Sequence, residues 1–217
     1  QKGVVLKTMP VRPDGSLDEG AFERLLSVRT KLLAVTHMSN ALGTVVPVAE
    51  LVKKAHAVGV KVLVDGSQAV AHLDVDMQEI GCDFYVFTGH KLYGPTGIGV
   101  LYGRYDELNA LPPYQGGGEM IEQVSFDKIT FKEAPYRFEA GTPAIVEVIG
   151  LGAAVDYLKG LDKAVIHAHE QKLLTEAEKK LAAIEGVRIL SKAPKRAAIL
   201  SFVFDDVHPH DVATIFD

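Results

Sequence analysis

The sequence predicts an α/β fold built on a mainly parallel sheet, and three observations support this prediction. First, 47% of the 217 residues are hydrophobic, which is enough for one large core or for a core with part of a second domain. Second, short apolar runs typical of buried strands alternate with segments of helical periodicity. Third, the helical segments are roughly 10–15 residues long, which suits crossover connections between parallel strands.

The first half of the chain alternates strand and helix signals. Leu32–Thr36 is typical of a buried strand, and residues 48–58 then carry apolar side chains at helical spacing. Pro47 stands where the first turn of a helix tolerates proline, and Gly59 is expected to close this helix. Further strands are predicted at residues 60–64, 84–87 and 98–102. A parallel sheet of this kind binds its ligand at the carboxyl ends of its strands.

The second half is expected to be irregular at first and mixed afterwards. Residues 103–142 contain two consecutive prolines and Gly116-Gly117-Gly118, which indicates a long irregular segment. Pro143 is expected to open a helix to about residue 161, and an amphipathic helix is expected over 163–184. Strands are predicted at 187–190 and 197–204, and the start of another helix at 208–217.

Composition narrows the functional class. The formal net charge is −5 and the basic residues are scattered, so we expect neither a nucleic-acid partner nor an anionic membrane partner. The apolar runs are too short to span a bilayer, and we expect no signal segment at the start of the chain. Cys82 is the only cysteine, which excludes a disulfide scaffold within this chain and favours a cytoplasmic location.

An acid and a lysine follow two of the predicted strands. Asp65 comes directly after strand 60–64, and Lys91 follows strand 84–87 by way of Thr88, Gly89 and His90. A carboxylate at the end of a buried strand is costly to keep charged unless a cation meets it. Enzymes that use pyridoxal 5′-phosphate (PLP) hold the pyridine nitrogen with a carboxylate and the aldehyde carbon with a lysine.

Each of these residues also has an ordinary structural interpretation. Asp65 alone is as well explained by a turn or helix cap, and Lys91 alone by a solvated surface position. His90 alone is more often a structural histidine, although it and Thr88 provide donors suited to a phosphate. The combination on neighbouring strand ends favours the functional interpretation.

Three segments carry a family resemblance. VLVDGSQAVAH (62–72), CDFYVFTGHKLYGPTGIGVLYG (82–103) and RFEAGTP (137–143) resemble the class V aminotransferase family. THMSNALGT (36–44) and YQGGGEMI (114–121) fit its cysteine desulfurase branch of the SufS type, which is shared with selenocysteine lyases. The resemblance implies the three-layer α/β/α large domain of PLP-dependent transferases over residues 1–160, followed by the start of a small α+β domain over 161–217.

The resemblance also implies a role for individual residues. Lys91 would form the Schiff base with PLP and move the proton, while Asp65 would pair with the pyridine nitrogen. Gln68 would bond the phenolic oxygen of PLP, Thr88 and His90 would bind its phosphate, and Asn40 would approach the substrate carboxylate. Gly116 and Thr142 would reach the phosphate of the other subunit's cofactor, because the family is homodimeric.

Other motif interpretations are weaker. Gly94, Gly97 and Gly99 precede a predicted strand, whereas a dinucleotide-binding glycine loop follows a strand and opens a helix. Gly116–Gly118 lacks the following lysine of a nucleotide-triphosphate loop. The eight histidines show no spacing typical of a metal site, so no metal is expected.

One part of the resemblance fails within this chain. A cysteine desulfurase needs a thiolate near the cofactor, yet Cys82 precedes the strand that Lys91 follows. A strand of four to five residues at about 3.3 Å each separates the two by roughly 15 Å or more. The nucleophilic cysteine, the carboxylate-binding arginine and the ring-stacking histidine of the family would lie outside this chain. We therefore expect an internal portion of a longer enzyme, with Cys82 as a buried packing residue.

The predicted function is a PLP-dependent cysteine desulfurase that converts L-cysteine to L-alanine. Sulfur would leave as a persulfide for iron–sulfur cluster assembly, with a sulfur-acceptor protein as a partner. A selenocysteine lyase, another class V aminotransferase and a non-catalytic fragment remain as alternatives.

Overall fold

A four-stranded sheet forms the centre of the computed structural model, which describes residues 3–217. Its strands are β1 (Leu32–Thr36), β2 (Lys61–Asp65), β3 (Phe84–Thr88) and β4 (Gly99–Gly103), in that spatial order. β1, β2 and β3 run parallel, and β4 is antiparallel to β3. The predicted α/β fold with a mainly parallel sheet is confirmed.

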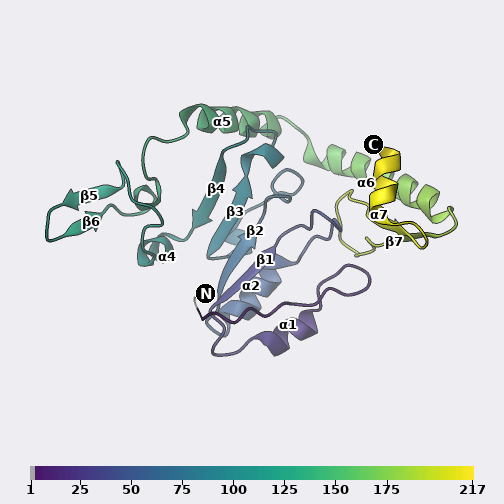
Figure 1. Cartoon of the computed structure of the whole chain (residues 1–217), viewed down its shortest axis with the longest axis horizontal. Helices are drawn as coiled ribbons and strands as arrows, with labels where there is room; N and C mark the ends of the chain where they lie inside the picture. Colours follow the sequence, from purple (N-terminus) through teal and green to yellow (C-terminus); the bar gives the residue numbers. More distant parts are fainter. Residues whose placement is uncertain (1–2) are drawn as a thin grey trace.

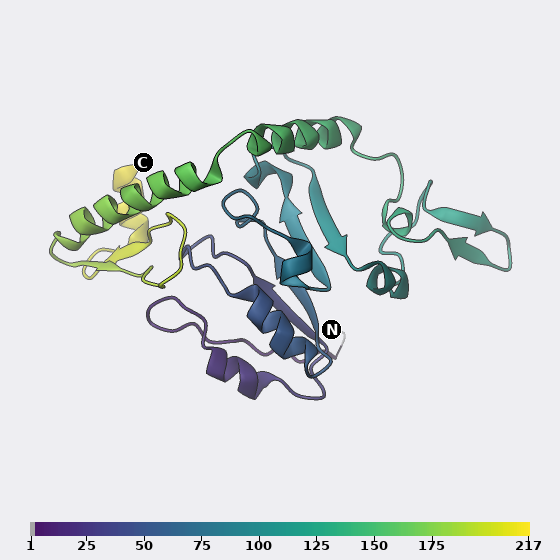
Figure 2. The ribbon, with the colours of Figure 1, turned by 180° about the vertical axis from the view of Figure 1, so that it is seen from behind.

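Helices lie on both sides of this sheet (Figures 1 and 2). α1 (Glu19–Leu25) and α2 (Val48–His56) cover one side, and α2 is the crossover between β1 and β2. The short α3 (Met77–Ile80) connects β2 to β3. On the other side, α5 (Ile145–Lys159) packs its Leu151 and Leu158 against Leu92, which follows β3.

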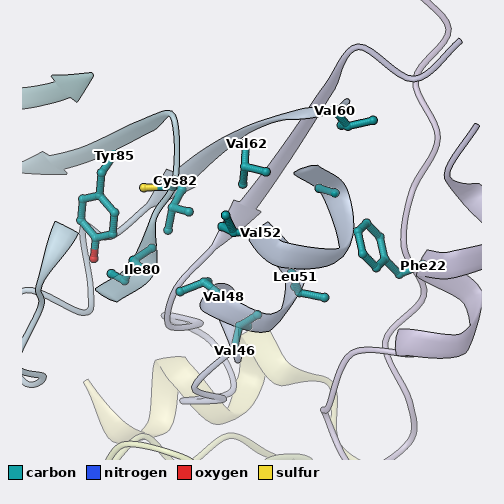
Figure 3. Packing of buried hydrophobic residues seen from close by; sticks show 12 residues of the cluster. Phe22, Val46, Val48, Leu51, Val52, Val60, Val62, Ile80, Cys82 and Tyr85 are labelled. Carbon is teal, nitrogen blue, oxygen red and sulfur yellow. The ribbon is translucent and has the colours of Figure 1, made fainter. Parts of the chain in front are cut away.

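The main core fills the space between the sheet and α1 and α2 (Figure 3). Val62 and Val64 of β2 are fully buried and alternate with less buried residues, as a strand with one packed face requires. α2 turns a stripe of apolar side chains towards them, with Leu51 and Ala55 fully buried. Tyr85 of β3 lies in the same cluster, which places one polar hydroxyl inside an apolar core.

The segment after β4 differs from its prediction. Residues 103–142 were expected to be irregular, but they contain α4 (Tyr105–Ala110), the hairpin β5 (Ile121–Val124) and β6 (Ile129–Phe131), and a short 3₁₀ turn (Tyr136–Phe138). The hairpin extends away from the sheet (Figure 1). The prediction missed it because its strands are short and mostly exposed, so alternating burial leaves little trace in the sequence.

The last part of the chain begins with the long helix α6 (Lys163–Ala182). It is followed by an antiparallel pair, β7 (Val187–Ile189) and β8 (Phe202–Phe204), and by α7 (Pro209–Phe216). The strand predicted at 197–204 is therefore shorter than expected. No helix among residues 3–217 is both long and apolar enough to cross a membrane.

Candidate active site

The predicted acid and lysine lie on neighbouring strands at one edge of the sheet. Asp65 is the last residue of β2 and is paired in register with Val86 of β3. Lys91 is the last residue of the 3₁₀ turn Gly89–Lys91, which follows β3 directly. Because β2 and β3 are parallel, both side chains belong to the carboxyl edge, and both are exposed to solvent.

The turn between β3 and Lys91 is compact. A Cβ atom on Gly89 would lie 2.8 Å from Cγ2 of Ile98, so only glycine fits at this position. The N–H of Gly89 donates to the carbonyl of Ile98 at 2.9 Å, which ties the turn to the start of β4. This packing fixes the path along which the chain delivers Lys91.

Thr88 and His90 lie on either side of Gly89 and contact each other. Oγ1 of Thr88 is 2.7 Å from Nδ1 of His90. His90 is exposed and Thr88 is partly buried. A hydroxyl and an imidazole held together beside Lys91 form a set of donors that suits an anionic group such as a phosphate.

The loop after β2 carries Gln68. The carboxylate of Asp65 accepts a hydrogen bond from the N–H of Ser67 at 2.9 Å, which starts a tight turn. The N–H of Ala69 donates to the carbonyl of Gly66 at 2.8 Å and closes the turn. Gln68 is therefore held one turn beyond Asp65 and is partly buried.

Asn40 lies in the loop that follows β1. Oγ of Ser39 accepts hydrogen bonds from the N–H groups of Ala41 and Leu42, at 3.3 and 3.0 Å. These bonds shape the loop and leave Asn40 exposed. Since β1 is parallel to β2 and adjacent to it, Asn40 lies at the same sheet edge as Asp65.

Gly116 and Thr142 belong to a different part of the molecule. The N–H of Gly141 donates to the carbonyl of Gly118 at 2.9 Å, so the stretches that contain Gly116 and Thr142 lie side by side. Among residues 3–217, no hydrogen bond joins residues 112–143 to the strand ends at 36–91. Both residues are exposed. The structure brings the segments of these two residues together, and no hydrogen bond among residues 3–217 ties them to the strand ends that carry the other six.

Cys82 lies at the opposite end of β3 from Lys91. It precedes β3, is fully buried and belongs to the main core (Figure 3). Burial raises the pKa of its thiol, so the reactive thiolate is disfavoured. Its position and its protonation state both agree with a packing role.

Two residues near the site were not predicted from the sequence. His37 follows β1 directly, and its Nδ1 lies 2.9 Å from the hydroxyl of Tyr85 in β3. Both side chains are buried. The position of His37, directly after a strand that ends at the site, was the only sequence signal for it.

The donor set fits PLP better than a metal. A carboxylate, a lysine amine, an amide and a hydroxyl–imidazole pair match the ring nitrogen, the aldehyde, the phenolic oxygen and the phosphate of PLP. The Thr88–His90 contact and the turn at Gly89 hold these donors next to Lys91. No group of three or more potential metal ligands occurs within residues 3–217.

A mainly parallel α/β sheet with an acid and a lysine at adjacent strand ends is an arrangement typical of PLP-dependent transferases, in which a lysine forms the Schiff base and a carboxylate meets the ring nitrogen. The chain belongs to the aminotransferase class-V family, which matches residues 1–217. It is 46% identical over 215 residues to a probable cysteine desulfurase of Xylella fastidiosa, covering 99% of this chain and 52% of the relative. It is 48% identical over 217 residues to a cysteine desulfurase of Dickeya dadantii, covering 100% of this chain and 52% of the relative.

Solved structures show the same similarity. The cysteine desulfurase CsdA of Escherichia coli superimposes with a TM-score of 0.88 at 40% identity, over 95% of this chain and 51% of that one. The apo cysteine desulfurase of Thermococcus onnurineus NA1 gives a TM-score of 0.86 at 37% identity, over 97% of this chain and 53% of that one. The chain thus spans about half the length of these relatives.

Proposed function

We propose that the protein is a PLP-dependent cysteine desulfurase that converts L-cysteine to L-alanine and passes the sulfur on as a persulfide. The observation that carries this proposal is the placement of Asp65 and Lys91 on adjacent parallel strand ends. The similarity to proteins named cysteine desulfurase supports the choice of L-cysteine as the substrate. We further propose the SufS type and a role in iron–sulfur cluster assembly, which rest on the sequence resemblance, and a cytoplasmic location, which rests on the single cysteine.

Lys91 and Asp65 would perform the central steps. Nζ of Lys91 would bind the cofactor covalently. When the substrate releases Lys91 from the cofactor, the free amine would transfer the proton at the substrate α-carbon. PLP, when bound, supplies an electron sink for the bonds around that carbon. The carboxylate of Asp65 would keep the ring nitrogen protonated, because a nearby negative charge favours the charged form.

The remaining residues of the sheet edge would bind and orient. Thr88 and His90, joined at 2.7 Å, would donate to the phosphate. Gln68 would bond the phenolic oxygen, and Asn40, exposed on the loop after β1, would meet the substrate carboxylate. Each of these groups holds a part of the reactants that does not itself react.

Gly116 and Thr142 would act on the cofactor of a second subunit in a homodimer. This assignment is supported by the absence, among residues 3–217, of any hydrogen bond between their segments and the strand ends of their own chain. The nearby hairpin also exposes apolar side chains, with Phe126 at its tip fully exposed. Exposed apolar surface of this kind is typical of an interface.

The sulfur-accepting thiol would come from outside this chain. Cys82 is buried at the end of β3 opposite to Lys91. We therefore assign the persulfide to a cysteine in the part of the relatives' length that this chain does not cover. A separate sulfur-acceptor protein would then take the sulfur. We also propose that residues 1–160 form part of the PLP-binding large domain and that residues 161–217 begin a small domain.

A labelling experiment tests the assignment of Lys91. The protein is loaded with PLP, reduced with borohydride and digested, and the labelled peptide is identified by mass spectrometry. We expect the label on the peptide that contains Lys91 and on no other peptide, and a Lys91→Ala variant should remain unlabelled. Label on Lys61 or Lys132 instead would end the proposal. Formation of alanine from cysteine, measured on a portion of the full-length protein that has not been reduced, tests the substrate.

A further inference from the structure

A buried polar pair lies beneath the edge of the sheet that carries the site. The hydroxyl of Tyr85, the second residue of β3, is 2.9 Å from Nδ1 of His37, and the two rings meet edge to face. Tyr85 is fully buried, and His37 is 8% exposed. Burial raises the pKa of Tyr85 and lowers the pKa of His37, so both side chains are neutral near pH 7. The pair is therefore a neutral hydrogen bond in a dry environment, where such bonds are strong.

Tyr85 reaches this position by passing under the residue that follows Asp65. A Cβ atom on Gly66 would lie 2.0 Å from the phenol ring and hydroxyl of Tyr85. Only glycine leaves room for the ring, so the phenol is in direct contact with the backbone next to Asp65. A shift of Tyr85 would move this backbone, because close-packed interiors transmit displacements.

His37 holds Asp65 from the other side. The N–H of His37 donates to the carbonyl of Asp65 at 2.8 Å, and the N–H of Gly66 donates to the carbonyl of Val86 at 2.8 Å. The backbone of Asp65 is thus bonded to the end of β1 on one side, while the next residue is bonded to β3 on the other. The Tyr85–His37 hydrogen bond joins these two flanking strands directly below it.

We infer that Tyr85 and His37 are positioning residues that set the place of the Asp65 carboxylate at the sheet edge. Neither residue would touch the reacting atoms. Their hydrogen bond would lock three strand ends together, so that the carboxylate is held where the ring nitrogen of PLP needs it. This inference rests on the proposed function, because it assumes that Asp65 meets that nitrogen. The general reason is that a functional group must be held by a rigid surrounding shell to act.

The test uses the full-length protein loaded with PLP. Tyr85→Phe removes only the hydroxyl and keeps the ring under Gly66. Tyr102→Phe is a matched control, because Tyr102 lies opposite Tyr85 in β4, packs against the same core and has no hydrogen-bond partner for its hydroxyl among residues 3–217. Asp65→Asn serves as the reference for loss of the charge itself.

The first measurement is the pH titration of the cofactor's absorbance spectrum. We expect Tyr85→Phe to shift its midpoint in the same direction as Asp65→Asn, by a smaller amount, and Tyr102→Phe to leave it unchanged. The second measurement is turnover. We expect a loss of about tenfold in kcat for Tyr85→Phe with KM for cysteine within about twofold of wild type, because misplacement of a catalytic group affects the reaction more than binding.

Variants of His37 provide an independent arm if Tyr85→Phe does not fold, as judged by circular dichroism. His37→Gln keeps a side-chain acceptor for the phenol, whereas His37→Ala does not. The titration midpoint of His37→Gln should lie closer to wild type than that of His37→Ala. Equal midpoints in the two variants would overturn the inference.

Failure of the inference is distinguishable from failure of the proposed function. If borohydride fixes no PLP to Lys91 of the wild-type protein, the proposed function itself is wrong. If Lys91 is labelled and Asp65→Asn alters the spectrum, but Tyr85→Phe titrates and turns over as wild type does, only the positioning role is wrong. An equal effect of Tyr102→Phe would also count against it, since it would show that any lost hydroxyl in this core disturbs the site.

Discussion

Asp83 carries a buried carboxylate at the end of β3 opposite to Lys91. Its side chain is 1% exposed, and its Oδ2 accepts hydrogen bonds from Nε2 of His56 and from the N–H of Val62, both at 2.7 Å. Nζ of Lys61 lies 3.6 Å from Oδ1. Burial by itself would raise the pKa of Asp83, but the hydrogen bonds and the nearby cation outweigh it and lower the pKa below its ordinary 3.8.

This residue yields a prediction about stability and pH. A carboxyl group whose pKa is lowered by folding stabilises the fold above its unfolded pKa, and this contribution is lost as the pH falls below 3.8 through the lowered value. We expect Asp83→Asn to reduce the free energy of unfolding by about 3 kcal/mol at pH 7, because it breaks a buried charged network. Urea unfolding of the full-length protein at pH 7 and in acidic buffer below pH 3.8 measures both effects.

Asp76→Asn is the matched control for Asp83→Asn. Asp76 is an exposed cap of α3 that accepts from the N–H groups of Gln78 and Glu79, and asparagine caps a helix about as well. The free energy of unfolding of Asp76→Asn should differ from that of wild type by no more than a few tenths of a kcal/mol. The account of Asp83 is wrong if its variant is as stable as the control, or if wild type and Asp83→Asn lose stability in parallel as the pH falls.

At the scale of elements, the strands that carry the site could be predicted and their pairing could not. Leu32–Thr36 was placed correctly, and the strands that begin at Lys61 and Phe84 were placed within a residue, because buried parallel strands leave continuous apolar runs. The antiparallel direction of β4 was not predicted, because hydrophobicity carries no signal for strand direction. The 10 residues between Thr88 and Gly99 form turns rather than a crossover helix, which is the structural reason for this reversal.

The site itself was predicted in part for the same reason. Residues directly after strands, such as Asp65, Thr88 and Lys91, could be named because strand ends place them. Tyr85 could not be named, since an aromatic residue within an apolar strand is indistinguishable from ordinary packing. Its contact with His37 joins positions 48 residues apart, and only the folded chain brings them together.

The turn from β3 to Lys91 gives a prediction at this scale. In Gly89→Ala the new Cβ atom would lie 2.8 Å from Cγ2 of Ile98 and 3.1 Å from its carbonyl oxygen. Backbone must therefore shift, and overpacking of this kind costs about 1–3 kcal/mol. We expect weaker retention of PLP, measured by absorbance after gel filtration, together with a lower Tm.

Gly152→Ala is the control for this change. Gly152 lies in α5, where a Cβ atom would meet nothing within 4 Å. Alanine favours a helix over glycine by about 1 kcal/mol, so this variant should be as stable as wild type or slightly more stable. Full retention of PLP by Gly89→Ala would show that the turn tolerates a side chain and does not set the position of Lys91.

At the scale of the whole molecule, apolar side chains are exposed on the surface away from the sheet. α5 exposes Val146 by 78% and Ile149 by 69%, so its apolar residues are not confined to the face that packs on the rest of the chain. Helices of this composition are stable when other protein covers them. Together with the exposed hairpin tip at Phe126, this surface supports an assembly in which these elements contact further protein.

Mixed dimers test whether two subunits share a site. If Thr142 acts on the partner's cofactor, a dimer of one Lys91→Ala subunit and one Thr142→Val subunit has one site with both changes and one site with neither. Neither homodimer has an intact site, so mixing should recover up to half of the wild-type activity per heterodimer and restore tight PLP binding at one site.

Differently tagged subunits, co-expressed and purified through both tags, ensure that heterodimers are measured. If both residues serve the same subunit, every site in the heterodimer keeps one change and no recovery occurs. Heterodimers that form without recovery would therefore assign Thr142 to its own subunit, and the separation of Gly116 and Thr142 from the strand ends would need another explanation.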